Sequence, residues 1–245
     1  MPKERIFRFK RFTASHGRSA IPIGMDGVLV GAWCDVSDAR TILDVGTGCG
    51  LIALICAQRN PQARISGIDP HAPSVQEAAD NFAASPWPDR LTAMESSFDS
   101  ITDTRFDLIV SNPPFFHDGV DTPARSARLA ARHADVFGPL QLITHGATLL
   151  TPQGRISLIA PARDEDVLLE TAVGAGLKPV RLCHVISRPG TEPIRLLLEL
   201  VTADSPHQSC ERTSLTIHRP DPTANPLDDY TPEYRMLTAP FYLRF

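Results

Sequence analysis

The stretch DLIVSNPPFFHDG joins an apolar run to residues that could do chemistry. The side-chain oxygen of Asn112 and the carbonyl of Pro113 are two acceptors that could bind both hydrogens of a planar amine and stabilise charge developing on its nitrogen. Pro113 and Pro114 have a fixed φ and no amide hydrogen, so they would hold these acceptors rigidly. Phe115 could stack on a base. The alternative interpretation is a proline-rich connection with Phe115 and Phe116 packed into the core.

A glycine-rich turn, DVGTGCG, places Gly46, Gly48 and Gly50 at alternate positions between an apolar strand and a helix. Glycine permits positive φ and lets a ligand approach the backbone. The dinucleotide fingerprint G-x-G-x-x-G has a different spacing, which argues against NAD. The turn resembles the D-x-G-x-G-x-G loop of class I S-adenosylmethionine-dependent methyltransferases. This resemblance implies S-adenosylmethionine as the cofactor, with Asp44 near its methionine end.

Further cofactor contacts are expected at the ends of the next strands. Asp69 ends the second predicted strand, where its carboxylate could accept hydrogen bonds from both ribose hydroxyls. The resemblance implies an acid and an apolar residue after the third strand, to hold the adenine. Here Ser97 and Phe98 occupy that place, so Ser97 could make only a neutral hydrogen bond, while Phe98 could cover the adenine face. Asn112 follows the fourth strand and would lie at the cofactor too.

Elements that would position these residues alternate along the chain. Apolar runs predict strands at 41–45, 63–69, 90–96, 106–112, 154–161, 178–187 and 194–203. Periodic patterns predict helices at 51–59, 73–85, 139–150, 164–176 and 231–239. The alternation predicts an α/β fold with a doubly wound, seven-stranded, mostly parallel sheet of the Rossmann-like class. Residues 203–232 are predicted to be rich in loops around one short strand.

Composition favours one large α/β domain with extensions, because the chain has 245 residues and 42% hydrophobic content. No apolar run approaches the ~20 residues of a membrane span, and the basic N-terminus lacks the apolar core of a secretory signal, so we expect a cytoplasmic protein. The five cysteines are scattered without a C-x-x-C pair. We therefore expect neither a disulfide framework nor a metal site.

Basic residues are concentrated near the N-terminus, although the net charge of −4 taken alone argues against a nucleic-acid partner. Aromatic residues alternate with them, and cations beside aromatic rings suit RNA with unstacked bases. We expect RNA contacts at Arg5, Arg8, Lys10 and Arg11, with stacking by Phe7, Phe9 and Phe12. The alternative is a solvated, flexible segment.

A second basic group, Arg125, Arg128 and Arg132, would share one face of a helix or of a loop that orders on RNA. An ordinary solvated face is the alternative.

Five stretches together resemble one family along nearly the whole chain. They are FRFKRFTASHGRSAIPIGMDGVLVGAW, ILDVGTGCGLIALICAQR, SPWPDRL, FDLIVSNPPFF and YTPEYRMLTAPFYL, and they are similar to the tRNA1(Val) adenine-37 N6-methyltransferase family. The resemblance implies methylation of the exocyclic N6 amine of adenine 37 in a valine tRNA. It assigns catalysis to Asn112, Pro113, Pro114 and Phe115, and it places Asp26 and Gly27 in the wall of the cofactor pocket. Departures are Ser97 and the long proline-rich stretch before the last helix.

The chain is expected to divide into three parts: a basic extension that also walls the cofactor site (1–35), the methyltransferase core (36–202), and a C-terminal extension packed on the same domain (203–245). Rival functions remain. Guanine N2 methylation of ribosomal RNA is one, because NPPFFHDG also resembles N-P-P-F-H-x-G, although such enzymes typically carry a second domain. Glutamine N5 methylation of a protein is another, although enzymes with that activity favour an N-P-P-Y motif. A cofactor-binding protein without catalysis would have no need of Asn112.

Overall fold

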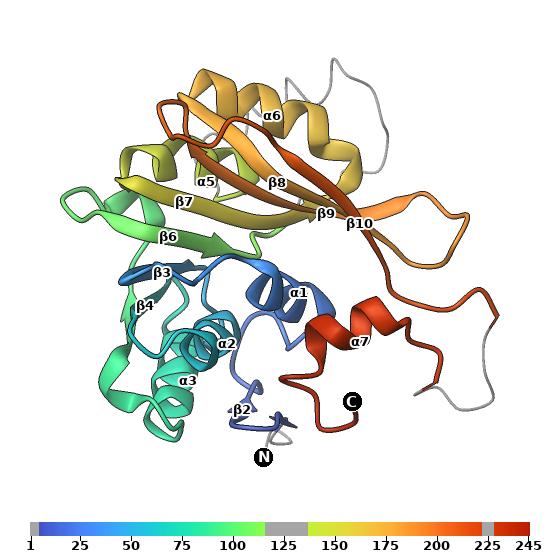
Figure 1. Cartoon of the computed structure of the whole chain (residues 1–245). Helices are drawn as coiled ribbons and strands as arrows, with labels where there is room; N and C mark the ends of the chain where they lie inside the picture. Colours follow the sequence, from blue (N-terminus) through green and yellow to red (C-terminus); the bar gives the residue numbers. More distant parts are fainter. Residues whose placement is uncertain (1–4, 116–136, 222–227) are drawn as a thin grey trace.

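A twisted sheet lies at the centre of the protein (Figure 1). Its strands are β3 (Thr41–Val45), β4 (Arg64–Asp69), β5 (Leu91–Glu95), β6 (Phe106–Ser111), β7 (Leu150–Pro161), β8 (Leu177–Ile186), β9 (Pro193–Thr202) and β10 (Glu211–Thr216). They lie in the order β10-β8-β9-β7-β6-β3-β4-β5. Neighbours are parallel except that β9 runs antiparallel to β7 and β8. The structure is a computed structural model and describes residues 5–115, 137–221 and 228–245.

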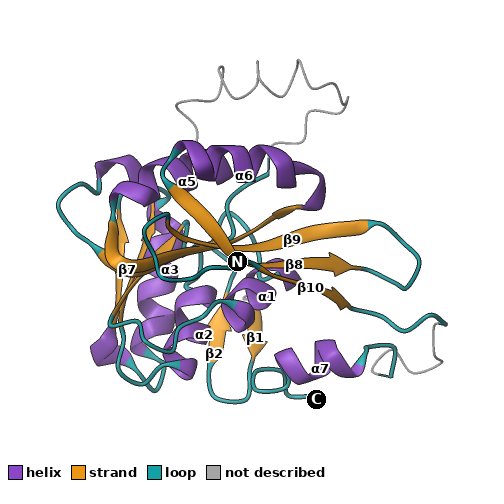
Figure 2. Cartoon of the chain, turned by 45° about the horizontal axis from the view of Figure 1, so that its top comes forward, coloured by secondary structure: helices purple, strands orange, loops and turns teal. Residues whose placement is uncertain are grey.

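Helices cover both faces of this sheet, as the alternating sequence pattern predicts. They are α1 (Met25–Trp33), α2 (Leu51–Arg59), α3 (Ala72–Ala83), α5 (Pro139–Thr148), α6 (Glu165–Gly174) and α7 (Pro232–Thr238). Helices α1, α2 and α3 lie on one face, and α5 and α6 lie on the other (Figures 1 and 2). The doubly wound, mostly parallel α/β fold is therefore confirmed.

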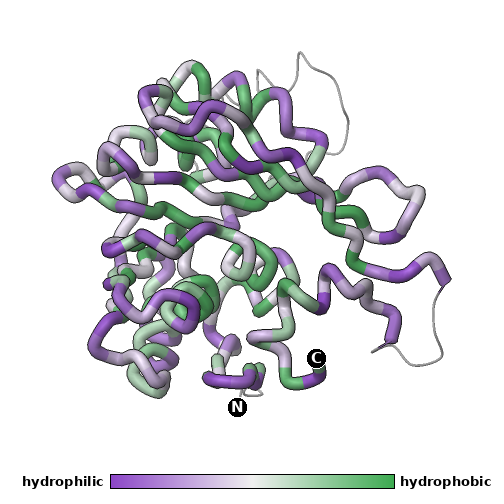
Figure 3. The backbone as a smooth tube through the Cα atoms, in the orientation of Figure 1, coloured by the Kyte–Doolittle hydropathy of each residue, from purple (hydrophilic) through white to green (hydrophobic). Residues whose placement is uncertain are grey.

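Two apolar clusters hold the layers together. Successive residues of β7 enter different clusters: Leu158 packs toward α5 and α6, whereas Ile159 packs toward α1 and α2. This follows from the two-residue period of a strand. Hydrophobic colouring runs along the central strands (Figure 3). Because both faces are covered, the strands read as apolar runs in the sequence.

The predicted count of seven strands in the sheet is wrong, because β10 joins it as an eighth. β10 pairs in parallel with β8, from Glu211 opposite Arg181 to Thr216 opposite Ile186. Only Leu215 of this edge strand is buried. An edge strand with little burial needs no apolar run, so its sequence resembles the loops around it.

The N-terminal segment is folded, contrary to the expectation that its phenylalanines face RNA. β1 (Ile6–Arg8) and β2 (Thr13–Ser15) form a hairpin. Phe9 and Phe12 are only 4% and 5% exposed. They stack on each other at 4.5 Å between ring centroids, and Phe9 also stacks on Tyr242 at 6.1 Å. Their burial in the main core leaves these two rings no face for an unstacked base.

The C-terminal extension closes over this hairpin and over α1. Thr231 caps α7 by accepting a hydrogen bond from the amide of Tyr234 at 3.2 Å. The amide of Lys10 donates to the carbonyl of Phe241 at 2.8 Å, so both extensions are joined through the backbone. Among the residues that the structure describes, no helix is long and apolar enough to cross a membrane.

Candidate active site at the carboxyl edge of the sheet

Three predicted site segments emerge side by side because their strands are neighbours. Val45, the last residue of β3, is opposite Ser111 of β6 and Ile68 of β4. The next residues in each chain segment are Gly46, Asn112 and Asp69. The Ser111 hydroxyl donates to the carbonyl of Val45 at 2.7 Å and fixes the ends of two of these strands together. Parallel strands thus place the glycine loop beside the NPPF segment.

The glycine loop adopts the backbone that its composition predicts. Gly46, Gly48 and Gly50 have φ values of 69°, 55° and 84°. A Cβ at Gly50 would lie 2.3 Å from Cε1 of Phe82, so a side chain is excluded there. A Cβ at Gly48 would meet nothing within 4 Å. The loop therefore packs tightly at its helix end and borders open space in its middle.

Asp44 lies beneath this loop and is fully buried. Its Oδ2 accepts hydrogen bonds from the Thr47 hydroxyl at 2.7 Å and from the amide of Ala53 at 3.1 Å. Its Oδ1 is buried and has no hydrogen-bond partner among the described residues. Burial raises the pKa of Asp44 to about 7, and the nearby charge of Asp69 adds to the rise. A cation placed at this loop would favour the ionised carboxylate.

The Asp69 side chain is oriented by two backbone donors. Its Oδ2 accepts from the amide of Gly48 at 3.0 Å, and its Oδ1 accepts from the amide of His71 at 2.9 Å. Each carboxylate oxygen can accept a further hydrogen bond. Asp69 therefore stands at the strand end with acceptor capacity for a pair of hydroxyls.

Asn112 follows β6 with its side-chain oxygen turned inward. Its Oδ1 is buried and has no partner among the described residues. A buried amide oxygen without a hydrogen bond is costly, which makes it a candidate for binding a donor from a ligand. Pro113 is buried, and Phe115 is partly buried against both apolar clusters. The guanidinium of Arg195 lies 5.2 Å from the centroid of the Phe115 ring.

At the expected adenine end, Phe98 is held among other rings. This ring is only 4% exposed and packs edge-on against Phe137 at 5.8 Å and His145 at 4.8 Å. The contact of Phe98 with the adenine stays a prediction. Ser97 is exposed, and the interaction of its side chain with Asp99 lowers the pKa of that carboxyl.

Phe137 is a residue that sequence reasoning missed. A Cβ at Gly46 would lie 3.5 Å from Cε1 of Phe137, which places this partly buried ring beside the glycine loop. No local pattern marks it, because the contact depends on where α5 docks.

Asp26 and Gly27, expected in the cofactor wall, have structural partners in other elements. A Cβ at Gly27 would lie 3.2 Å from Cδ2 of Leu51, so glycine allows α1 to approach α2 closely. The Asp26 carboxylate accepts a hydrogen bond from Nε of Arg195 at 2.8 Å. The role of this pair as a cofactor wall stays a prediction.

Two buried polar residues of α3, which sequence reasoning also missed, tie residues 15–19 to the glycine loop. Glu77 accepts hydrogen bonds from the amides of Gly17, Arg18 and Ser19. Asn81 donates to the carbonyls of Ser15 and Cys49, each at 2.8 Å. The sequence could have indicated them, because these two polar residues are four positions apart and share the buried face of this helix.

The predicted RNA-binding residues fall into three groups. Arg5, Arg8 and Arg11 are exposed, and the guanidinium of Arg11 lies 5.4 Å from the centre of the Trp87 ring. Lys10 is also exposed, but its Nζ donates to main-chain oxygens of Ala239 at 2.7 Å and Phe245 at 2.6 Å. The remaining residues, Arg125, Arg128 and Arg132, lie outside the described residues.

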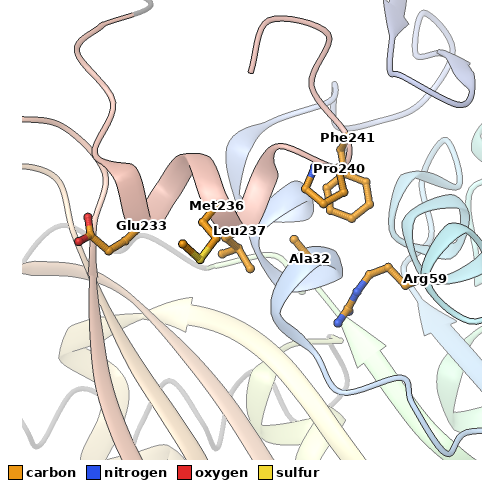
Figure 4. Close-up of a pocket in the computed structure, with 7 residues that line it drawn as sticks. All are labelled: Ala32, Arg59, Glu233, Met236, Leu237, Pro240 and Phe241. Carbon is orange, nitrogen blue, oxygen red and sulfur yellow. The ribbon is translucent and has the colours of Figure 1, made fainter.

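A separate groove of about 440 Å³ lies between α1, α2 and α7 (Figure 4). Its lining residues are Ala32, Arg59, Glu233, Met236, Leu237, Pro240 and Phe241. None of the predicted site residues is among them, so this groove is distinct from the edge at which Asn112 lies.

The residues at the sheet edge fit S-adenosylmethionine. Asp44 offers a buried acceptor for a cation, Asp69 offers a carboxylate for the ribose hydroxyls, and Gly48 borders open space. The geometry thus supports the cofactor that the glycine loop implied.

Comparisons with known proteins identify a family of methyltransferases. The methyltransferase small domain family matches residues 28–174. The chain is 39% identical over its full length to tRNA1(Val) (adenine(37)-N6)-methyltransferase of Aeromonas hydrophila, covering 100% of both chains. It is 41% identical to the protein of that name from Phocaeicola vulgatus, covering 97% of each chain.

Solved structures share the fold. A predicted O-methyltransferase from Agrobacterium tumefaciens superposes with a TM-score of 0.62 at 18% identity, over 88% of this chain and 96% of that one. The T. thermophilus 16S rRNA N2 G1207 methyltransferase, solved with AdoMet and guanosine, has a TM-score of 0.56 at 22% identity, over 82% of this chain and 51% of that one. From the sequence relatives together with the site, the chain belongs to the tRNA1(Val) (adenine(37)-N6)-methyltransferase family of S-adenosylmethionine-dependent enzymes.

Proposed function

We propose that this enzyme methylates the exocyclic N6 amine of an adenine in tRNA, at position 37 of a valine tRNA, as the names of its relatives indicate. The observation that carries the proposal is the buried, unpartnered Oδ1 of Asn112 beside the glycine loop. A tRNA substrate also implies the cytoplasm as the compartment.

Asn112 and the main chain of Pro113 would accept the two hydrogens of the amine. The nitrogen lone pair of such an amine is conjugated into the ring, so the amine is a poor nucleophile. Two fixed acceptors would orient it and stabilise the charge that develops on nitrogen. S-adenosylmethionine supplies the electrophilic methyl group. Phe115 would stack on the base once it has left its own stack, and Pro114 would keep the segment rigid.

The cofactor would be held by residues on three strand ends. We assign Asp44, Gly46, Gly48 and Gly50 to its methionine part and Asp69 to its ribose. This assignment is supported by the positive φ of the glycines and by the orientation of the Asp69 carboxylate.

We propose that residues 36–202 form the methyltransferase core, with 1–35 and 203–245 as extensions. The hydrogen bonds that join Lys10 to residues 239–245 support this division, because the two extensions contact each other.

Transfer of a labelled methyl group tests the proposal. The protein is incubated with labelled S-adenosylmethionine and separately with bulk tRNA, ribosomal RNA and a protein extract, and the RNA is then digested to nucleosides. We expect N6-methyladenosine in tRNA alone. A valine tRNA transcript with guanosine at position 37 is the matched control and should accept no methyl group. Label in N2-methylguanosine of ribosomal RNA, or in protein, would overturn the assignment.

A further inference from the structure

Arg195 joins three parts of the protein that are far apart in the sequence. Its Nε donates to Oδ2 of Asp26 in α1 at 2.8 Å, and its Nη1 donates to the carbonyl of its neighbour Ile194 at 3.0 Å. The same guanidinium lies 5.2 Å from the centroid of the Phe115 ring. The side chains of Arg195 and Asp26 are 28% and 26% exposed, so this ion pair is partly shielded from water.

The strand directions explain how Arg195 reaches the active edge. β7 is parallel to β6, with Leu158 opposite Ser111, so its carboxyl end lies at the same edge as Asn112. β9 is antiparallel to β7 and places Arg195 opposite Pro161. The beginning of β9 therefore lies at the same edge of the sheet as the ends of β6 and β7. The residues that follow Arg195 in β9 are buried leucines, which fix the strand in the core.

We propose that Arg195 is a positioning residue for base capture: it holds the Phe115 ring at the angle that receives the target base, and Asp26 holds the guanidinium. The inference rests on the proposed function. A guanidinium can bind a carboxylate through its edge while its charge attracts an aromatic face. Both contacts are present at Arg195. Without them only the contacts with the two apolar clusters would hold the Phe115 ring, and the base would lose part of its stacking surface.

Steady-state kinetics with valine tRNA test the role of the cation. We expect Arg195→Gln to raise the KM for tRNA by about fivefold, the scale of one cation–π contact, with a smaller change in kcat. Arg195→Lys should raise KM less than Arg195→Gln does, because the ammonium keeps the positive charge but lacks the planar guanidinium. Asp26→Asn should raise the same KM less. Arg235→Gln is the matched control, since Arg235 lies 5.6 Å from the Phe245 ring and pairs with Asp228 at 3.5 Å, away from Asn112. It should leave KM unchanged.

A double-mutant cycle separates positioning from a general structural role. In a Phe115→Leu background, Arg195→Gln should have no further effect on KM, because the ring through which it acts is gone. Thermal unfolding of every variant shows whether the fold is retained, and the affinity of the Arg195 variants for S-adenosylmethionine should stay within about twofold of wild type.

Three results would overturn the inference: an unchanged KM in Arg195→Gln, a lowered KM, or the same fold-change in both Phe115 backgrounds. The wild-type product is determined first. If wild type does not methylate adenine in tRNA, the proposed function fails. If it does, and Arg195→Gln matches it, only the positioning role of Arg195 fails.

Discussion

At the residue scale, Asn112 and Asp44 share one property: each has a buried side-chain oxygen without a hydrogen-bond partner among the described residues. Leaving such an atom unpaired costs about 1–3 kcal/mol. Both residues were singled out from the sequence alone, since motif and strand end marked them. Their burial could not be predicted, because it depends on how β3, β6 and the glycine loop pack together.

Replacement of Asn112 tests its proposed role in catalysis. Asn112→Ala should lower methyl transfer by about a hundredfold to a thousandfold, the usual effect of removing one charge-stabilising group. Its affinity for S-adenosylmethionine should remain near that of wild type. Asp69→Ala should show the opposite pattern and weaken cofactor binding first, because the ribose hydroxyls lose a charged acceptor. Calorimetric titration and single-turnover methylation separate the two effects. A wild-type rate for Asn112→Ala would remove this residue from the mechanism.

Asp44 predicts a pH dependence of stability. Its pKa is raised by burial to about 7, whereas an unfolded aspartate titrates near its ordinary pKa of 3.8. Between these values the native state holds a proton that the unfolded state has released. The contribution of Asp44 to the free energy of unfolding is therefore complete below about pH 4, declines as the pH rises to about 7, and is constant above that.

Asp44→Asn should lack this decline, which is on the order of a few kcal/mol. The amide oxygen of asparagine can still accept hydrogen bonds from Thr47 and Ala53. Urea unfolding of both proteins at several pH values from 4 to 8 provides the measurement. Parallel stability curves would show that Asp44 does not titrate in this range.

At the element scale, the spacing of apolar residues and the positions of glycine and proline predicted most strands and helices. Parallel strands covered on both faces are apolar runs, and α3 has apolar residues on one side only. The failures have physical causes. α1 was not assigned because residues 27–32 are all buried and show no period. β10 was assigned to a loop-rich excursion because only Leu215 is buried. The hairpin β1–β2 has short strands whose packing depends on residues 241–245, more than two hundred positions later.

The glycine loop gives a matched pair of substitutions. Gly50→Ala should destabilise the fold by about 2–4 kcal/mol, since its Cβ would clash with Phe82 at a φ of +84°. Gly48→Ala should cost only about 1 kcal/mol, because its φ of +55° is tolerable and nothing lies within 4 Å. It should instead weaken cofactor binding by adding a methyl group where the backbone borders open space. Chemical denaturation and calorimetric titration measure both, and equal losses of stability would contradict this account.

At the scale of the whole molecule, the site is assembled from segments that no local pattern connects. Arg195 of β9 lies over the Phe115 ring, Asn81 of α3 donates to Cys49 in the glycine loop, and only the tertiary fold brings them there. Asn112 and Asp69 could be predicted from sequence motifs because both residues lie at the ends of predicted strands. Supporting residues depend on strand order and helix docking, which the sequence specifies only through the entire packing arrangement.

The basic residues of the N-terminal hairpin should contribute to RNA affinity through charge. Because Arg8 and Arg11 are exposed, the Arg8→Gln, Arg11→Gln variant should weaken tRNA binding. The slope of log affinity against log salt should fall by about 0.7–0.9 for each phosphate that an arginine no longer neutralises. Cofactor affinity should not change.

Lys10→Gln is the informative contrast. Its Nζ contacts Ala239 and Phe245, so this variant should lower the melting temperature more than it changes the salt slope. The affinity of each variant for tRNA, measured at several salt concentrations, gives the salt slopes that are compared. If the slope of the double arginine variant equals that of wild type, the hairpin does not contact phosphate.

The ribosome synthesises the chain from its amino end, so Lys10 cannot bind the carbonyl of Phe245 until 235 further residues have been added. At about 5–20 residues per second this delay is roughly ten to fifty seconds. Throughout that time Phe7 and Phe9 lack their contacts with Tyr242, while the central strands are already available to pair. The hairpin therefore completes its packing after the sheet. Until then the nascent chain exposes an aromatic surface near its amino end that is prone to association. A truncation before α7 would make that transient exposure permanent, with aggregation rather than lost catalysis as its first sign.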